Sequence, residues 1–162
     1  MSYPDPRYLG DGGEPSAARR PADAAHDVVY PSGTTVDYLA TAGSTDRLFG
    51  LYRWNMAAHA GGPGPHFHRT MAESFYVLGG VVTIYDGRQW LECSAGDFVH
   101  VPAGGIHGFR NDSARTASML IHFAPGAPRE AYFEGFLRFA REGELDPAEM
   151  EEFYLAHDNI RL

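Results

Sequence analysis

Two histidines and a glutamate form the first group of residues whose spacing is suited to chemistry. His66 and His68 are two positions apart, so on a β-strand both imidazoles point to the same face. Glu73 lies five positions after His68, which would place it on the opposite face of one unbroken strand. A turn or bulge within residues 69–71 is therefore needed before Glu73 can meet the histidines. Two imidazoles and a carboxylate would then form part of a ligand shell for a divalent transition metal, with bonds of about 2.0–2.2 Å.

A second stretch, residues 96–111, adds a fourth candidate ligand. It reads Gly-Asp-Phe-Val-His-Val-Pro-Ala-Gly-Gly-Ile-His-Gly-Phe-Arg-Asn, and His107 follows a turn predicted at residues 102–104. Alone, the first stretch could equally be the polar rim of a loop, because His-x-His pairs occur by accident. The second stretch favours the metal site.

Together the two stretches resemble the signature motifs of the cupin superfamily. The first motif is Gly, five residues, His-x-His, three or four residues, Glu, six residues, Gly. This chain matches it at His66, His68, Glu73 and Gly80. At the leading glycine it has Ala60 instead, which leaves only the first turn of the motif different.

The second cupin motif is Gly, five residues, Pro-x-Gly, two residues, His, three residues, Asn. The chain matches it at every position: Gly96, Pro102, Gly104, His107 and Asn111. The resemblance implies an all-β fold, the cupin double-stranded β-helix or jelly-roll barrel. It also implies the metal ligands, which are His66, His68, Glu73 and His107.

Within the superfamily, the chain resembles the small single-domain quercetin-dioxygenase-like group. The residues that carry this likeness are the runs 73–80 and 96–102 and the aromatic helix expected after Pro128. The group implies that Glu73 is both a metal ligand and a catalytic base that takes a proton from a substrate hydroxyl.

The expected cofactor is one divalent transition metal per chain, and N/O ligands of this kind suit Fe, Mn, Ni, Co or Zn. We expect a dioxygenase that acts on a small phenolic or enolisable substrate, like the flavonol dioxygenases. One alternative is a metal-dependent isomerase or polyketide-type cyclase, which would work without O2. Another is a non-enzymatic small-molecule or metal-binding cupin. Turnover under anaerobic conditions, or binding without turnover, would separate these hypotheses.

Alternation along the predicted strands indicates an apolar substrate pocket beside the metal. In residues 48–58 one side carries Tyr52, Trp54 and Met56, which we assign to the barrel interior. If Glu73 points inward, Phe75 and Val77 do so as well. The predicted pocket residues are Trp54, Met56, Phe75, Val77, Phe98 and Phe109.

The elements that must position these residues are short strands separated by turns. Strands rich in Val, Tyr and Thr are predicted within residues 28–42, 48–58, 81–85, 89–93, 98–101 and 119–123. After residue 126 the period becomes helical, with Phe133, Phe136, Leu137 and Ala140 on one face. A second helix is expected after Asp146, with Met150, Phe153, Tyr154 and His157 on its apolar face. The predicted domains are an irregular arm (1–28), a cupin barrel (29–125) and C-terminal helices (126–162).

Composition limits the classes of partner and the compartment. The chain has 162 residues and a formal net charge of -8, which argues against nucleic acid as a partner. No apolar run approaches the roughly 20 residues of a membrane span, and the N-terminus does not resemble a secretory signal. The single cysteine, Cys93, allows no internal disulfide. We therefore expect a cytoplasmic protein that binds a small-molecule substrate, without nucleic-acid or membrane partners.

The remaining expectations concern the subunits and the other polar residues. The superfamily resemblance implies a homodimer. Arg19 and Arg20 are predicted to be solvated surface charges, His26 is predicted to be exposed and inert, and His59 is assigned to a surface loop. His100 and His122 are predicted to be structural or surface histidines rather than ligands. The acidic run 142–152 is interpreted as a solvated face.

Overall fold

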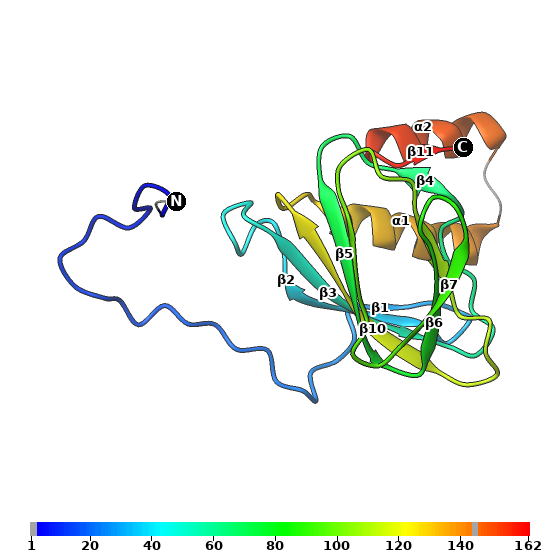
Figure 1. The fold of residues 1–162 in the computed structure, drawn as a ribbon, viewed down its shortest axis with the longest axis horizontal. Helices are drawn as coiled ribbons and strands as arrows, with labels where there is room; N and C mark the ends of the chain where they lie inside the picture. Colours follow the sequence, from blue (N-terminus) through cyan, green and yellow to red (C-terminus); the bar gives the residue numbers. More distant parts are fainter. Residues whose placement is uncertain (1–2, 144–145) are drawn as a thin grey trace.

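The fold consists of short strands followed by two helices, as seen in the computed structural model, which describes residues 3–143 and 146–162 (Figure 1). The strands are β1 (Val28–Val29), β2 (Thr35–Ala40), β3 (Gly50–Met56), β4 (His66–Phe67), β5 (Ala72–Gly79), β6 (Val81–Tyr85), β7 (Trp90–Ser94), β8 (Phe98–Val101), β9 (Gly108–Arg110), β10 (Ala117–Ala124) and β11 (Ile160–Arg161). The helices are α1 (Arg129–Glu142) and α2 (Pro147–Ala156). The predicted all-β fold with a helical tail is confirmed.

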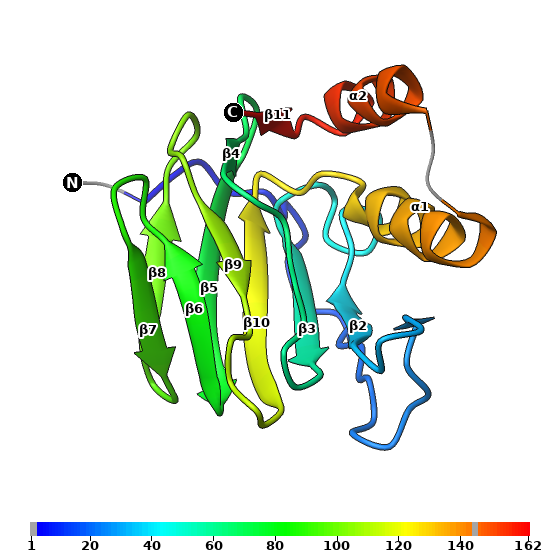
Figure 2. The same ribbon diagram turned by 90° about the vertical axis from the view of Figure 1, so that its right-hand side faces the viewer.

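Most strands belong to two antiparallel sheets, and in Figure 2 β6, β7 and β9 lie in front of β5 and β8. The larger sheet has the order β1-β2-β3-β10-β5-β8, and the smaller has the order β7-β6-β9. The sequence-distant strands β3 and β5 both pair with β10, so the chain crosses over between them as a jelly roll does. A third ladder joins β11, near the C-terminus, to β4.

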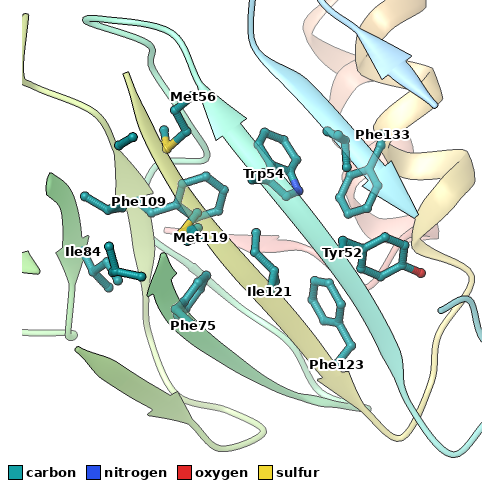
Figure 3. Close-up of a cluster of buried hydrophobic side chains, with 14 of the residues drawn as sticks. Tyr52, Trp54, Met56, Phe75, Ile84, Phe109, Met119, Ile121, Phe123 and Phe133 are labelled. Atoms are coloured by element: carbon teal, nitrogen blue, oxygen red, sulfur yellow. The ribbon is translucent and has the colours of Figure 1, made fainter. Parts of the chain in front are cut away.

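Alternate side chains of the strands point inward and fill the space between the sheets, as predicted. Tyr52, Trp54 and Met56 on β3 are buried, while the residues between them are only half-buried. Met119, Ile121 and Phe123 repeat the pattern on β10. Figure 3 shows these side chains meeting Phe75, Ile84 and Phe109 in one core. Because the pattern has period 2, each strand also has a fixed outward face.

The helical tail docks on this barrel. Phe133 of α1 belongs to the core and lies edge-on to Tyr52, with ring centroids 5.1 Å apart. α2 has no fully buried residue and instead packs Phe153 on Tyr132 of α1, with ring centroids 5.5 Å apart. The helix predicted after Asp146 is present and begins with a capping box: Asp146 accepts from Ala148, and Glu149 accepts from the backbone of Asp146. Residues 144–145 of the predicted acidic run lie outside the described residues.

The non-ligand positions of the two motifs have structural roles. Gly80 has φ = 71°, and a Cβ there would lie 2.5 Å from the carbonyl oxygen of Thr116, so only glycine fits. Asn111 is buried and donates to the carbonyls of Ala57 and Arg115 while it accepts from Ser113. The chain differs from the first motif at position 60, where it has Ala60 in place of glycine. The residue with a positive φ (54°) is His59, so position 60 does not require the conformational freedom of glycine.

Residues 3–27 contain no helix or strand, and in Figure 1 much of this arm runs away from the barrel. The first two residues of the predicted arm lie outside the described residues. Within the described residues, neither helix has the length and apolar character needed to cross a membrane.

Candidate metal centre and cavity

Four buried side chains converge at one end of the barrel. His66, His68, Glu73 and His107 each offer one ligand atom, and these four atoms lie within 4.8 Å of one another. The chain bends at residues 69–70, where the spacing of His68 and Glu73 required a turn, and Glu73 then lies on β5. Reciprocal backbone hydrogen bonds of 2.9 and 2.8 Å hold His66 beside His107. The structure thus brings together the four predicted ligands.

The hydrogen bonds of the imidazoles show that this donor set fits a metal ion. The Nδ1 atoms of His66, His68 and His107 face the backbone carbonyls of Gly64, Asp158 and Gly105. A carbonyl oxygen only accepts, so each Nδ1 carries a hydrogen, and Nε2 presents its lone pair whenever the imidazole is neutral.

Two of these Nε2 atoms face the carboxylate of Glu73. The Nε2 atoms of His68 and His107 lie 3.0 and 2.8 Å from Glu73 Oε2. Lone pairs that face an anion at this distance need a proton or a metal cation between them. These four side chains could therefore hold one divalent metal ion.

The shifted pKa values of the cluster favour the charge states that bind a cation, a neutral His66 and an ionised Glu73. Burial, followed by the nearby His107, lowers the pKa of His66 to about 4, so His66 is neutral at pH 7. Burial alone would raise the pKa of Glu73, but His107 and His68 lower it well below its usual range. Burial alone would lower the pKa of His107, but Glu73 outweighs it and raises this pKa. Glu73 is thus ionised, and the raised pKa of His107 favours a proton at this site that a metal ion would displace.

The cluster opens onto a cavity of about 470 Å³ between the barrel and the helices. His66 and Glu73 line it, so two of the four candidate ligands face the open space. Much of the remaining wall is aromatic: Tyr30, Trp54, Phe109, Phe123, Tyr132, Phe133, Phe136 and Tyr154. A cavity of this volume, apolar and with a few polar groups, is typical of a small-molecule site.

The structure corrects part of the predicted pocket. Trp54 and Phe109 line the cavity, but Met56, Phe75 and Val77 are buried in the core and are not part of its wall. Alternation gives the direction of a side chain and not its depth, so it could not separate these two sets. Phe98 was wrongly placed in the pocket: its side chain is 63% exposed and lies on the outer face of β8.

Sequence reasoning missed the contribution of the C-terminal segment. Arg129, Tyr132 and Asn159 line the cavity, and the Asp158 carbonyl holds His68. The Asp158 carboxylate also accepts hydrogen bonds from the backbone of Arg69 and Thr70. The only signal in the sequence was the apolar face of the predicted helices, which required a docking surface but did not identify it.

A second buried carboxylate, Asp37, was not predicted to matter. Its side chain is only 1% exposed and lies 2.8 Å from Arg53 Nε and 2.6 Å from His26 Nδ1. The prediction that His26 is inert is therefore wrong, because the sequence alone does not show that His26 contacts Asp37 on β2. Arg20 was predicted to be a solvated surface charge, but it is partly buried and pairs with Asp27 at 2.9 Å.

The other histidines outside the cluster have structural contacts or lie at the surface. His100 lies 2.9 Å from the Ser74 hydroxyl, and His122 packs on the ring of Phe49 with centroids 5.6 Å apart. His59 is exposed in its loop. These positions agree with the sequence predictions.

Comparison with known proteins agrees with this fold. Residues 52–123 match the cupin domain family. Quercetin 2,3-dioxygenase of Bacillus subtilis (strain 168) is 37% identical over 87 residues, which cover 52% of this chain and 24% of that relative. The chain therefore spans about a quarter of the length of the curated relative that it matches.

Solved structures share the fold at low sequence identity. KdgF from Halomonas sp. has a TM-score of 0.56 and 18% identity, with 65% of this chain and 89% of that chain covered. The polyketide cyclase RemF from Streptomyces resistomycificus has a TM-score of 0.55 and 24% identity, with 69% and 80% covered. The fold, the motifs and these matches define the class: the chain has the cupin fold and contains a cupin domain over residues 52–123. More particularly, this domain keeps four potential metal ligands, and residues of the helical C-terminal segment line its cavity.

Proposed function

We propose that this chain is a metal-dependent dioxygenase that acts on a small phenolic or enolisable molecule. The observation that carries the proposal is the opening of a three-histidine, one-carboxylate cluster onto an aromatic cavity of about 470 Å³. The sequence likeness to a quercetin 2,3-dioxygenase supports the same reaction class. A bound Fe, Mn, Ni, Co or Zn ion would supply Lewis acidity toward a substrate oxygen and, where redox-active, activation of O2.

In this proposal the residues of the chain bind and orient the substrate and move its proton. His66, His68, His107 and Glu73 would hold the ion. Glu73 is ionised, and only its Oε2 contacts the imidazoles, so within the described residues Oε1 has no hydrogen bond. We assign to Glu73 the removal of a proton from a substrate hydroxyl. The aromatic wall would keep a flat substrate beside this carboxylate and exclude water.

The direct test is O2 consumption by the metal-loaded protein with a series of flavonols and other enolisable phenols. We expect substrate-dependent O2 uptake, and its loss in Glu73→Gln. Asp37→Asn, which changes the other buried carboxylate, should keep the activity. No O2 uptake with any of these substrates would contradict the dioxygenase assignment, and product formation under anaerobic conditions would replace it with an isomerase or cyclase.

We further propose that the chain forms a homodimer through the outer face of the large sheet. Tyr76 and Leu78 on β5 and Phe98 on β8 point away from the core and are 43%, 42% and 63% exposed. Apolar side chains clustered in this way favour a protein interface. Sedimentation should show a dimer, and Phe98→Glu should convert it to a monomer. A monomeric wild-type protein would contradict the proposal.

A further inference from the structure

Arg129, the first residue of α1, places a positive charge inside the cavity. Its side chain is only 4% exposed, and it lines the same cavity as His66 and Glu73. Its Nη1 atom donates to the carbonyl of His157 at 2.8 Å. The guanidinium lies over the ring of Tyr132, 4.1 Å from its centroid, so aromatic contacts fix its plane.

This buried charge has no carboxylate partner among the described residues. The neighbouring acids of α1 are used elsewhere, since Glu130 accepts from Tyr52 and Glu134 accepts from Tyr38. Glu73 contacts His68 and His107, and no ion pair joins it to Arg129. Burying a charge without a counter-charge is strongly unfavourable, so a structural role alone does not explain Arg129.

Two donor atoms in the cavity wall lack acceptors. Within the described part of the chain, Arg129 Nε and Trp54 Nε1 are the buried side-chain N or O atoms without a hydrogen-bond partner. Both residues line the cavity, and Trp54 is only 9% exposed. A buried donor without an acceptor destabilises the protein, and an acceptor on a bound molecule would remove this penalty. A ligand with oxygen acceptors would satisfy both donors.

We propose that the cavity binds a small aromatic acid, with its carboxylate on the guanidinium of Arg129 and its ring among the aromatic side chains. A guanidinium holds a carboxylate with two parallel hydrogen bonds, and Nε is free to make one of them. Trp54 Nε1 donates to a second oxygen of the ligand. The inference narrows the substrate class and rests on the proposed function for its catalytic meaning, but its binding test requires no turnover.

The test compares the binding of 2-naphthoate with that of 2-naphthamide, its neutral counterpart, to the metal-loaded full chain by calorimetry without O2. We expect 2-naphthoate to bind about 10- to 100-fold more tightly, the value of a charged hydrogen-bond pair. Arg129→Gln should remove this preference, and Arg129→Lys should keep part of it. Arg138→Gln, an exposed arginine of the same helix, should bind both probes as the wild type does.

Several results would overturn the inference. Equal binding of the two probes to the wild type, or binding of neither, would show that Arg129 does not select an anion. A preference that survives in a folded Arg129→Gln protein would place the carboxylate at the metal ligands instead. Because the wild-type comparison uses no variant, a folding defect in Arg129→Gln does not rescue the inference. A naphthoate preference without O2 uptake in the flavonol assay would refute the dioxygenase while supporting anion binding.

Discussion

The barrel contains two buried carboxylates, Glu73 and Asp37, with opposite kinds of partner. Glu73 is 3% exposed and meets the imidazoles of His68 and His107. Asp37 is 0% exposed and meets the guanidinium of Arg53, with His26 at its rim. Arg53 is always charged, so the pair with Asp37 is complete at any physiological pH.

The difference separates a structural ion pair from a site prepared for a cation. A proton between Glu73 and His107 can leave, and a metal ion can take its place. Asp37 has one imidazole partner, His26, but its other partner is the guanidinium of Arg53, which keeps its protons and is no metal ligand. Burial of a carboxylate therefore does not by itself indicate a metal site. The chemistry of the side chains that contact the carboxylate does.

The largest expected effect is on metal affinity, which should fall when Glu73 is replaced and stay unchanged when Asp37 is replaced. Glu73→Gln removes the only anionic donor of the cluster, and we expect metal affinity to fall about 100-fold or more. Asp37→Asn should leave metal affinity unchanged, because none of its hydrogen-bond partners belongs to the cluster. Competition with a chromophoric chelator measures both. Equal losses in the two variants would erase the distinction.

Stability should show the reverse order. Asp37→Asn leaves Arg53 without its counter-charge, and we expect the metal-free protein to lose about 2–3 kcal/mol of unfolding free energy. Urea unfolding of metal-free wild type and variant measures the loss, with His59→Ala as a surface control. A loss below about 0.5 kcal/mol would mean that the Asp37 pair is of the weak, solvent-screened kind.

The two clusters should also respond to different ranges of pH. Burial alone would raise the pKa of Asp37, but His26 and Arg53 lower it. The stability it contributes is then present above its unfolded value of about 3.9 and is lost as the pH falls through the lower folded value. The pKa of His107 is raised in the fold, so a metal ion competes with its proton at a higher pH.

We therefore expect metal affinity to fall about tenfold per pH unit once the pH drops below the raised pKa of His107, which lies above the ordinary histidine value of about 6.5. The Asp37 contribution to stability should persist to about pH 4. Chelator competition at pH 8, 7, 6 and 5, and urea unfolding of wild type and Asp37→Asn from pH 7 to 3, measure the two ranges. Metal affinity that stays constant from pH 8 to 5 would contradict the displacement of a proton.

The sequence predicted that the four candidate metal ligands come together, because these residues lie in two short motifs with fixed spacing. The bend at residues 69–70 followed from the parity of His68 and Glu73. Arg129 and Asp37 were not predicted, since their roles depend on contacts between segments distant in the chain. Asp37 pairs with Arg53 across β2 and β3, and Arg129 enters the cavity only because α1 docks on the barrel.

The pocket was predicted in part for the same reason. Trp54 and Phe109 reach the cavity, whereas Met56, on the same face of β3 as Trp54, fills the core. Where the core ends and the cavity begins depends on the position of the helices, which strand periodicity does not encode. Phe98 lies opposite the exposed Tyr76 in the ladder between β5 and β8, so it is on the outward face of β8, whereas Val101 of the same strand is buried.

The most direct test of the account is the metal content of the protein. Elemental analysis of protein purified without chelator, and again after reconstitution, should find about one divalent transition-metal ion per chain. The same preparation of His66→Ala/His107→Ala should contain none, with the variant's fold checked by circular dichroism. Absence of metal from the wild type even after reconstitution, or equal metal in the folded double variant, would show that these four side chains do not form the site.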